Sequence, residues 1–362
     1  MKKVIPLFLI FASVAFPCMA DKWEEPSASE VYDLEKKEIQ ENRRYTKQQK
    51  EEELKWLDVD YKGAVARLTF HVTDSKSRSV TNANVGVRFR VGEEKPVERK
   101  GVTDENGVFV AEGKTTYEVF YDVTLENYYA FSSVRRYYKT DGIGVKDGRW
   151  QPWNPTIEIT LKKKRNPIPM YAQKATVRLP KNGEAFGYDF MVGDLVAPHG
   201  KGKQADLFLM CAFKTTGESF GDYKVELFIT AVQQDEGIMV NQKDEGAFKS
   251  AYEAQENGYE PQYYSVLERT ASEILQKIEL ASTEYLTFRS RIIRDDEGNI
   301  ISSHYGKIIM DGTIDYGIDF KNPEGTRVGF TYYFNPTPND RNIEYDPAEN
   351  LFDKVKFRGM QP

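Results

Sequence analysis

The chain has 362 residues, 13% of them aromatic, and its 50 basic and 56 acidic side chains leave a net charge of −6. This slight acidic excess argues against nucleic acid or an anionic membrane surface as the main partner, because both are bound through a surplus of basic residues. The length is sufficient for two domains with separate cores.

The first twenty residues have the pattern of a cleaved signal peptide. Lys2-Lys3 supply positive charge, and residues 4–16 form an apolar run. A cut after Ala20 would leave small residues at the first and the third position before the cleavage site, as signal peptidase requires. The run is shorter than the roughly 20 apolar residues that span a bilayer. Lipidation of Cys18 is the alternative to cleavage. We therefore expect an exported protein, periplasmic or at the cell surface, with no membrane span after cleavage.

Residues 21–60 predict a charged helical stalk. Ser27 and Glu30 have the spacing of a capping box, and helix-forming residues follow. Apolar positions are too sparse for a broad hydrophobic face or a coiled-coil heptad. We expect an exposed helix whose end docks on the next domain through Leu54, Trp56 and Leu57.

Residues 61–165 alternate apolar and polar side chains with a period of two, which predicts a seven-stranded antiparallel β-sandwich. The predicted strands lie near residues 70–72, 85–91, 97–103, 108–111, 119–125, 128–138 and 157–161. A tight turn separates the third from the fourth. In it Asp104 can accept backbone hydrogen bonds and Asn106-Gly107 tolerate positive φ.

Three motifs in this region resemble those of the carboxypeptidase regulatory-like domain, a transthyretin-like sandwich. They are Val72-Thr73-Asp74 at the end of the first strand, Ala83-Asn84-Val85 opening the next, and Thr103–Phe109 at the tight turn. Arg78-Ser79-Val80 and Asn127-Tyr128 depart from the family pattern. The resemblance covers residues 64–162 and implies a stability or interaction module without catalytic residues of its own.

Residues 166–362 predict a second, larger antiparallel β domain, and we recognise no family in this half. Asn166-Pro167-Ile168-Pro169 marks the boundary, because two prolines in four residues interrupt strand pairing. The apolar segments 207–213 and 225–232 are interpreted as strands buried on both faces. Apolar residues at helical spacing predict a helical insertion over residues 248–280.

Aromatic side chains are the first candidates for a binding site. Exposed aromatic rings stack on sugar rings or anchor protein partners. The candidates are Trp150, Trp153, Tyr259, Tyr263 and Tyr264. The alternative is that these rings cap the sandwich or brace the domain junction.

A second candidate is a metal site. His199 lies in a glycine-rich segment with Asp194 and Asp206 nearby, and histidine with carboxylates can bind a divalent ion. The alternative is an ordinary loop. We predict no cofactor, and Cys211, in an apolar strand, is not expected to be reactive.

These features predict an exported, non-enzymatic binding or structural protein of the bacterial envelope whose partner is a polysaccharide, a glycoprotein or a protein. One alternative is a metal-assisted hydrolase with its site around His199. Another is a purely structural envelope component. The sequence leaves the oligomeric state open.

Overall fold

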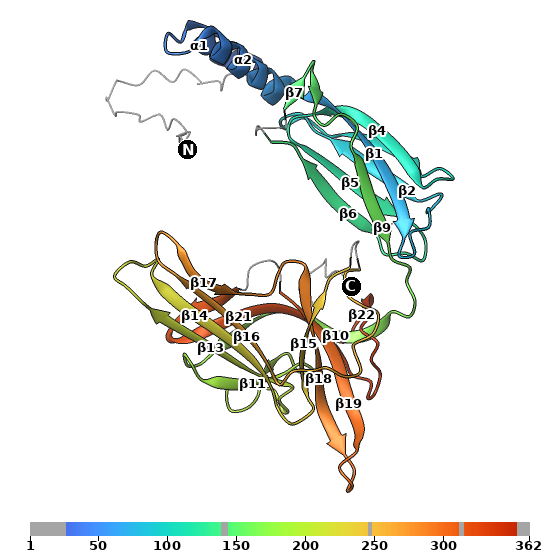
Figure 1. Ribbon diagram of the computed structural model, residues 1–362, viewed down its shortest axis with the longest axis vertical. Coiled ribbons are helices and arrows are strands. Elements are labelled where there is room, and N and C mark those ends of the chain that lie inside the picture. The colour runs from blue at the N-terminus through green and yellow to red at the C-terminus, as the bar shows by residue number, and fades with distance from the viewer. Residues whose placement is uncertain (1–26, 139–143, 245–247, 311–314, 353–362) are drawn as a thin grey trace, which may run out of the picture.

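The computed structural model describes residues 27–138, 144–244, 248–310 and 315–352. Over these ranges the protein is all-β, with two helices followed by strands that form four sheets (Figure 1). The predicted signal peptide, including Cys18, lies outside the described residues. In the described part of the chain, no helix has the length and apolar character needed to cross a membrane.

The N-terminal helices form a hairpin and not the single stalk that the sequence predicted. α1 (Ala28–Glu41) begins at the predicted capping box of Ser27, and α2 (Lys47–Lys62) begins at a second capping box on Thr46. α1 ends before Asn42, whose backbone is extended, and the second box starts a new helix at Lys47. Tyr32 of α1 donates a hydrogen bond of 2.8 Å to the Asp58 carboxylate of α2.

The end of α2 packs on the first sandwich, as predicted. Trp56, Leu57 and Val59 are buried, and Leu54 is half-buried. The Trp56 ring lies 6.0 Å from the ring of Trp150, measured between centroids. The helical hairpin is therefore joined to the core of the first domain through α2.

The seven strands predicted in the first domain are present, together with a short extra hairpin, among the described residues. They are β1 (Ala64–Asp74), β2 (Asn84–Phe89), β3 (Val97–Val102), β4 (Val108–Thr115), β5 (Glu118–Thr124), β6 (Phe131–Arg136) and β9 (Thr156–Leu161), with β7 (Val145–Lys146) and β8 (Arg149–Trp150) as the hairpin. One sheet pairs β4, β1, β9, β8 and β7, and the other has the order β3-β2-β5-β6. The inward-facing side chains of both sheets form one core.

The tight turn between β3 and β4 has the predicted chemistry. The Asp104 carboxylate accepts hydrogen bonds from the amides of Asn106 at 2.9 Å and Val108 at 2.8 Å. Gly107 has a φ of +73°, and a Cβ there would lie 2.4 Å from the Val72 carbonyl oxygen. Glycine is thus required by both the backbone angle and the close approach of β1.

The second domain is a sandwich of two larger sheets. Its strands are β10 (Ile168–Leu179), β11 (Ala185–Asp189), β12 (Asp194–Leu195), β13 (Leu207–Thr215), β14 (Tyr223–Ala231), β15 (Gly237–Gln242), β16 (Gln262–Arg269), β17 (Ile274–Ile278), β18 (Glu284–Arg294), β19 (Ile300–Ile309), β20 (Asp315–Asp319), β21 (Asn322–Asn335) and β22 (Tyr345–Asn350). One sheet has the order β15-β18-β19-β21-β10-β22, with β20 also on β21, and the other has the order β12-β11-β13-β14-β16-β17.

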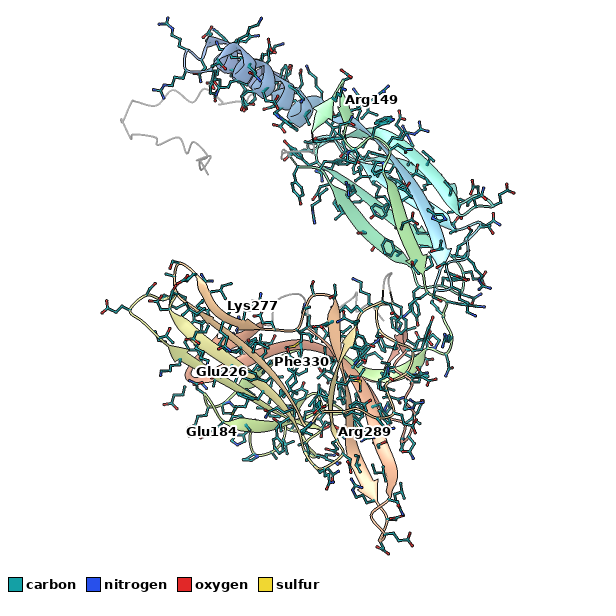
Figure 2. The ribbon with its side chains drawn as sticks, viewed as in Figure 1. Arg149, Glu184, Glu226, Lys277, Arg289 and Phe330 are labelled. Atoms are coloured by element: carbon teal, nitrogen blue, oxygen red, sulfur yellow. The ribbon has the colours of Figure 1, made fainter. Side chains whose placement is uncertain are left out.

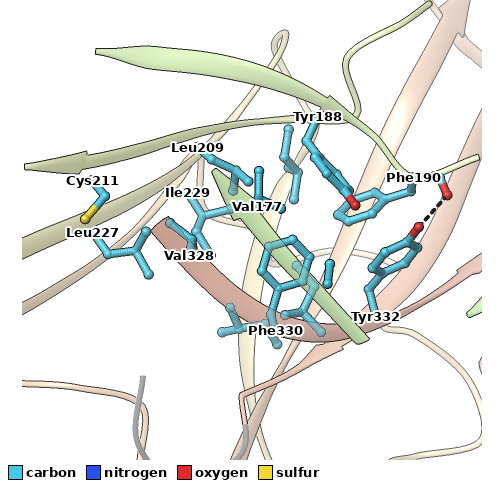
Figure 3. Packing of buried hydrophobic residues seen from close by; sticks show 14 of the residues in the cluster. Val177, Tyr188, Phe190, Leu209, Cys211, Leu227, Ile229, Val328, Phe330 and Tyr332 are labelled. Carbon is cyan, nitrogen blue, oxygen red and sulfur yellow. Dashed lines mark hydrogen bonds between the residues drawn. The ribbon is translucent and has the colours of Figure 1, made fainter. Parts of the chain in front are cut away.

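The core of this domain lies between the two sheets (Figure 3). Leu209, Leu227 and Ile229 of the six-stranded sheet meet Val328 and Phe330 of the other sheet there. The buried Tyr332 hydroxyl donates to the Phe190 carbonyl at 3.0 Å, drawn as the dashed line in Figure 3. Alternate residues of β13 and β14 are buried, and the residues between them are half-buried or exposed. The prediction that these strands are buried on both faces is therefore wrong.

The helical insertion predicted over residues 248–280 is also wrong. All of these residues are described, and they form loops and the antiparallel pair β16–β17. Val266 and Leu267 lie in β16, while Ile274 and Ile278 lie in β17. Their spacing fits a helix equally well, but β16 pairs along its length with β14, a partner remote in sequence. Tertiary pairing overrides such a local pattern.

A polar seam joins the two domains after β9. The buried Glu344 carboxylate accepts hydrogen bonds from the Tyr129 hydroxyl at 2.8 Å and from the amides of Arg165 at 2.8 Å and Asn166 at 2.7 Å. The Tyr129 ring stacks on Phe248 of the second domain, with centroids 4.8 Å apart. These contacts hold the connection between the domains in place.

Candidate functional site

The outer surface of the six-stranded sheet presents apolar side chains to solvent. In β13 and β14, the odd-numbered residues enter the core, so the even-numbered ones face outward. We call this surface the open face, and its central side chains are Phe208, Met210, Phe228 and Tyr264, bordered by Lys224, Glu226, Thr230 and Gln262. Figure 2 labels Glu226 on β14 and Lys277 on β17 in this sheet.

Strand register sets the central side chains side by side. Met210 lies opposite Phe228, and Phe228 lies opposite Tyr264, so the three form one row across β13, β14 and β16. The Phe228 and Tyr264 rings are 4.8 Å apart between centroids and tilted by 40°. All three side chains are half-buried. Such cross-strand aromatic pairs stabilise a sheet and also leave ring surface for a ligand.

Hydrogen bonds fix the orientation of the Tyr264 ring. Its hydroxyl donates to the Glu226 carboxylate at 2.7 Å, and the Lys224 ammonium lies 3.1 Å from the same oxygen. In the next row the Gln262 amide donates to the Thr230 hydroxyl at 3.0 Å. The ring pair is therefore flanked by polar groups that are already oriented.

The pKa values of this network follow from its hydrogen bonds. Partial burial, with the adjacent Glu226 carboxylate, raises the pKa of Tyr264 to about 12. The hydrogen bond from Tyr264 lowers the pKa of Glu226, and Lys224 acts in the same direction. Near neutral pH, Glu226 is thus ionised and Tyr264 keeps its proton. Lys224 and Glu226 neutralise each other.

An apolar ring pair flanked by hydrogen-bonding groups suits a ligand with one apolar face and polar edges. A pyranose ring has this form, with its C–H groups on one face and its hydroxyls at the edge. Gly187 lies opposite Phe208 in the register, and a Cβ on Gly187 would lie 2.8 Å from the Ala205 side chain and 3.3 Å from that of Val196. These two side chains therefore cover the sheet beside Phe208 and border the open face there.

The structure separates the three tyrosines that the sequence grouped together. Tyr264 lies on the open face, but Tyr263 is its neighbour in the strand and packs against the core from the opposite face. Tyr259 lies in the loop before β16, where its hydroxyl donates to the Gln255 carbonyl at 2.7 Å. Only Tyr264 of these three lies in the row with Phe228, because successive strand residues point to opposite faces.

The two tryptophans do not form an exposed stacking surface. Trp150 has 1% of its surface exposed, its indole N–H donates to the Thr115 carbonyl at 3.0 Å, and its ring stacks on Tyr137 with centroids 4.9 Å apart. Trp153 is half-buried beside the Arg149 guanidinium, 4.9 Å from its ring centroid. The expectation for Trp150 was therefore wrong, because this side chain fills the end of the first core.

The predicted metal ligands are engaged in other contacts. Asp194 accepts hydrogen bonds from the amides of Leu195 at 2.8 Å and Lys201 at 2.9 Å. His199 is exposed, and its ring lies edge-on to the Phe186 ring, with centroids 4.9 Å apart. The ranges that the structure describes contain no group of three or more His, Cys, Asp or Glu side chains that could hold a metal ion. His199, Asp194 and Asp206 therefore do not come together as predicted.

Asp206 instead belongs to a buried ion cluster that the sequence did not reveal. Arg291, at a bulge in β18, bridges the carboxylates of Asp206 and Asp189 at 2.7 and 2.8 Å. Both aspartates are buried, and the Ser290 hydroxyl also donates to Asp206 at 2.9 Å. Arg291 has a φ of +54°, which few non-glycine residues adopt. The bulge turns the Arg291 side chain inward. The alternation of apolar and polar residues in the sequence does not predict such a bulge.

A second buried group of charges lies at the seam between the domains. The Lys162 and Lys307 ammonium groups each lie 4.7 Å from the Phe248 ring centroid, and both donate to Ser250 at 2.7 Å, Lys162 to the carbonyl and Lys307 to the hydroxyl. Lys162 also contacts the Asp244 carboxylate at 2.5 Å. Lys162 is buried, whereas the three basic residues that follow it are exposed. Burial, with the nearby Lys162, lowers the pKa of Lys307 to about 7.

No family model matches the chain, and no curated protein matches it either. Among solved structures, 3-chlorocatechol 1,2-dioxygenase from Rhodococcus opacus 1CP is similar over 29% of this chain and 62% of its own, with 10% identity and a TM-score of 0.24. Catechol 1,2-dioxygenase from Acinetobacter radioresistens is similar over 29% of this chain and 54% of its own, with 16% identity and a TM-score of 0.22.

The chain therefore spans less than two thirds of the length of these dioxygenases. BcpA, the major pilin subunit of Bacillus cereus, is similar over 79% of this chain and 97% of its own, with 11% identity and a TM-score of 0.21. TM-scores of this size are too low for any of these proteins to indicate the function of the chain.

Proposed function

We propose that the protein is an exported, non-enzymatic binding protein of the bacterial envelope, and that the open face of its second domain binds a glycan. The observation that carries the proposal is the row of Met210, Phe228 and Tyr264, which places half-buried apolar side chains, two of them aromatic, on the outer surface of the sheet. The N-terminal pattern of residues 1–20 supports export.

The polar surroundings favour an uncharged ligand. Lys224 and Glu226 pair with each other, so the border of the ring pair presents balanced charges. The carboxylate of Glu226 and the hydroxyl and amide groups of Thr230 and Gln262 offer acceptors and donors to sugar hydroxyls. A neutral polysaccharide matches this surface better than a polyuronate, whose carboxylates would need an unpaired cation.

The first domain and the helical hairpin are assigned a supporting role. The resemblance of residues 64–162 to a carboxypeptidase regulatory-like domain is consistent with an interaction or stability module. The seam at Glu344 supports a fixed presentation of the second domain, because it ties three donors from the first domain and the linker to one buried carboxylate.

The test is a binding measurement on the full chain without residues 1–20. Neutral polysaccharides and a polyuronate are titrated by calorimetry against the unaltered protein, Phe228→Ala and Tyr264→Ala. Each variant is expected to lose about tenfold or more in affinity for the neutral glycan that binds, as truncation of a central contact usually does. Tyr264→Phe keeps the ring and should lose less.

Two exposed aromatics serve as matched controls. Phe120 on the first domain and Phe220 in the loop before β14 are 40% and 80% exposed, and their replacement by Ala should leave the affinity unchanged. Melting temperatures verify that every variant is folded. If no polysaccharide binds, or if Phe228→Ala and Phe120→Ala behave alike, the glycan proposal fails; binding of a protein partner through the same face would replace it.

A further inference from the structure

The sequence contains three Asn-Gly steps, and the fold surrounds each of them differently. They are Asn106-Gly107, Asn182-Gly183 and Asn257-Gly258. In such a step the asparagine side chain reacts most readily with the backbone that follows it, because glycine has no Cβ to shield its nitrogen. All three lie outside the strands, and each asparagine side chain is exposed. Local sequence and exposure therefore do not distinguish them.

The reaction open to such a step is deamidation through a cyclic imide. The glycine nitrogen gives up its proton to solvent and attacks the side-chain amide carbon, which forms a new N–C bond and expels ammonia. Water then opens the imide at one of its two carbonyls. Opening at the former side-chain carbonyl gives aspartate. Opening at the backbone carbonyl gives isoaspartate, whose main chain runs through the side-chain carbons.

Hydrogen bonds occupy both reacting groups at Asn182. Its side chain accepts from the Phe213 amide and donates to the Phe213 carbonyl, both at 2.8 Å. The nitrogen of Gly183 donates to the Cys211 carbonyl at 2.9 Å. Three hydrogen bonds must therefore open before the nitrogen can attack the side chain.

The tight turn restrains the step at Asn106. The Gly107 nitrogen donates to the Asp104 carbonyl at 3.0 Å, and the Asn106 amide donates to the Asp104 carboxylate at 2.9 Å. A Cβ on Gly107 would lie 2.4 Å from the Val72 carbonyl oxygen, so the turn is also pressed against β1. The attacking nitrogen is thus held by one hydrogen bond in a closely packed turn.

Asn257 lacks these restraints. Within the ranges that the structure describes, neither its side chain nor the Gly258 nitrogen has a hydrogen-bond partner. Both residues are exposed in the loop before β16. Solvent can therefore take the proton from the Gly258 nitrogen and carry ammonia away without prior opening of the fold.

We propose that Asn257 is a site of spontaneous deamidation, and that the fold protects Asn106 and Asn182 from the same reaction. Each hydrogen bond that must open first slows the reaction about fivefold. The rates should therefore fall in the order Asn257, Asn106, Asn182. The proposal does not depend on glycan binding, because it uses only the loop before β16.

The reaction would change a loop that is anchored on both sides of Asn257. The Glu256 carbonyl accepts a hydrogen bond from the Arg289 guanidinium at 3.1 Å. Glu260 and Ile238 exchange two backbone hydrogen bonds, at 2.8 and 2.9 Å. Isoaspartate lengthens the main chain between these anchors, and either product adds a negative charge. We expect the Ile238 and Glu260 amides to exchange hydrogen faster in the isoaspartyl form.

Incubation of the full chain without residues 1–20 at mildly alkaline pH tests the proposal. Mass spectrometry of peptides from a time series measures conversion at each step, and chromatography separates aspartyl from isoaspartyl peptides. Conversion at Asn257 should be about fivefold faster than at Asn106, with Asn182 the slowest. Asn257→Gln should abolish the fast conversion, because a glutamine side chain closes the ring far more slowly. Its melting temperature verifies that the variant is folded.

The unfolded chain is the matched control. In concentrated urea all three steps lose their hydrogen bonds and should convert at similar rates, so the differences seen in the folded protein measure protection by the fold. If Asn106 or Asn182 converts as fast as Asn257 in the folded protein, the proposal is wrong. The same holds if Asn257 is stable there but reacts in urea. An order of rates that persists in urea would assign it to the neighbouring side chains and overturn the role of the fold.

Discussion

Arg291 holds the carboxylate of Asp206 through two hydrogen bonds, from Nε to Oδ1 at 2.7 Å and from a terminal nitrogen to Oδ2 at 2.8 Å. The same guanidinium reaches Asp189 at 2.8 Å. This fork joins the segment after β11 to the bulge of β18, and so connects the two sheets of the second domain. An Arg–carboxylate pair of this geometry is among the stronger ionic contacts in proteins.

Replacement of Arg291 by Met should destabilise the second domain strongly. It would leave two buried carboxylates without their cation, a loss that typically costs about 3–5 kcal/mol. Urea unfolding of the variant measures the change. Arg294→Met is the control, because Arg294 pairs with Asp235 nearer the surface and should cost less than about 1 kcal/mol. Similar losses for both variants would contradict this interpretation of the cluster.

Removal of the Tyr264 hydroxyl should raise the pKa of Glu226. The hydrogen bond from Tyr264 is the main cause of its lowered value, so Tyr264→Phe should move the Glu226 titration upward. A carboxyl with a depressed pKa contributes stability above its unfolded value of about 4.3 that is lost as the pH falls through the folded pKa.

The loss of stability on acidification below about pH 4.3 should therefore be smaller in Tyr264→Phe. Carboxyl-detected NMR of the two proteins follows the titration of Glu226 directly. An unchanged Glu226 titration would show that the hydrogen bond does not persist in solution. Gln262→Ala, in the adjacent row of the open face, is the control and should not move it.

Lys307 should make stability rise with pH on the alkaline side of neutrality. Burial lowers its pKa to about 7 from the ordinary value of 10.5, so the unfolded chain binds more protons than the folded protein between these pH values. Stability increases with pH wherever the unfolded state binds the extra proton.

Lys307→Met should abolish this rise and should stabilise the protein below about pH 7, where the ammonium group is otherwise buried with its charge. Urea unfolding across the window compares the two proteins. Lys249→Met, an exposed lysine near the same seam, should retain the slope. If the stability of Lys307→Met rises with pH as steeply as that of the unaltered protein, the pH dependence belongs to another group.

Trp150 and Trp153 should differ sharply in their contribution to stability. Trp150 is enclosed by Trp56 and Tyr137 and its N–H is bonded to a carbonyl, so Trp150→Ala should cost about 3–5 kcal/mol through the cavity it leaves. Trp153 is half-buried, and Trp153→Ala should cost much less. Urea unfolding followed by circular dichroism measures both. Equal costs would mean that Trp150 is not the core residue described here.

Local chemistry in the sequence was sufficient to predict the first domain. Its seven strands follow from side-chain alternation. The turn after β3 follows from the side chain of Asp104 and the backbone freedom of Gly107, which act on neighbours within four residues. The capping box at Ser27 is equally local. Interactions of this kind need no knowledge of distant segments.

The candidate site depended on pairings between distant segments. Tyr264 is identifiable as an aromatic candidate, but Phe228 and Glu226, which give it a neighbour and an orientation, lie 36 and 38 positions earlier in the chain. Which of Tyr263 and Tyr264 faces solvent is decided by the register of β16 against β14, because a slip of one residue exchanges the two faces. The apolar residues of 266–278 have helical spacing and predicted a helix. They form strands because β16 pairs with the distant β14, which the local spacing does not reveal.

The sequence by itself determined the all-β class, the strands of the first domain and its defining turn, because alternation and turn chemistry act between near neighbours. Tertiary structure alone decided that Trp150 is core, that Arg291 turns inward at a bulge, and that Phe228 and Tyr264 share a solvent face. These outcomes depend on which distant strands pair and in which register. The register is fixed because one face of each sheet must be buried, and that face is buried only when the two sheets pack together.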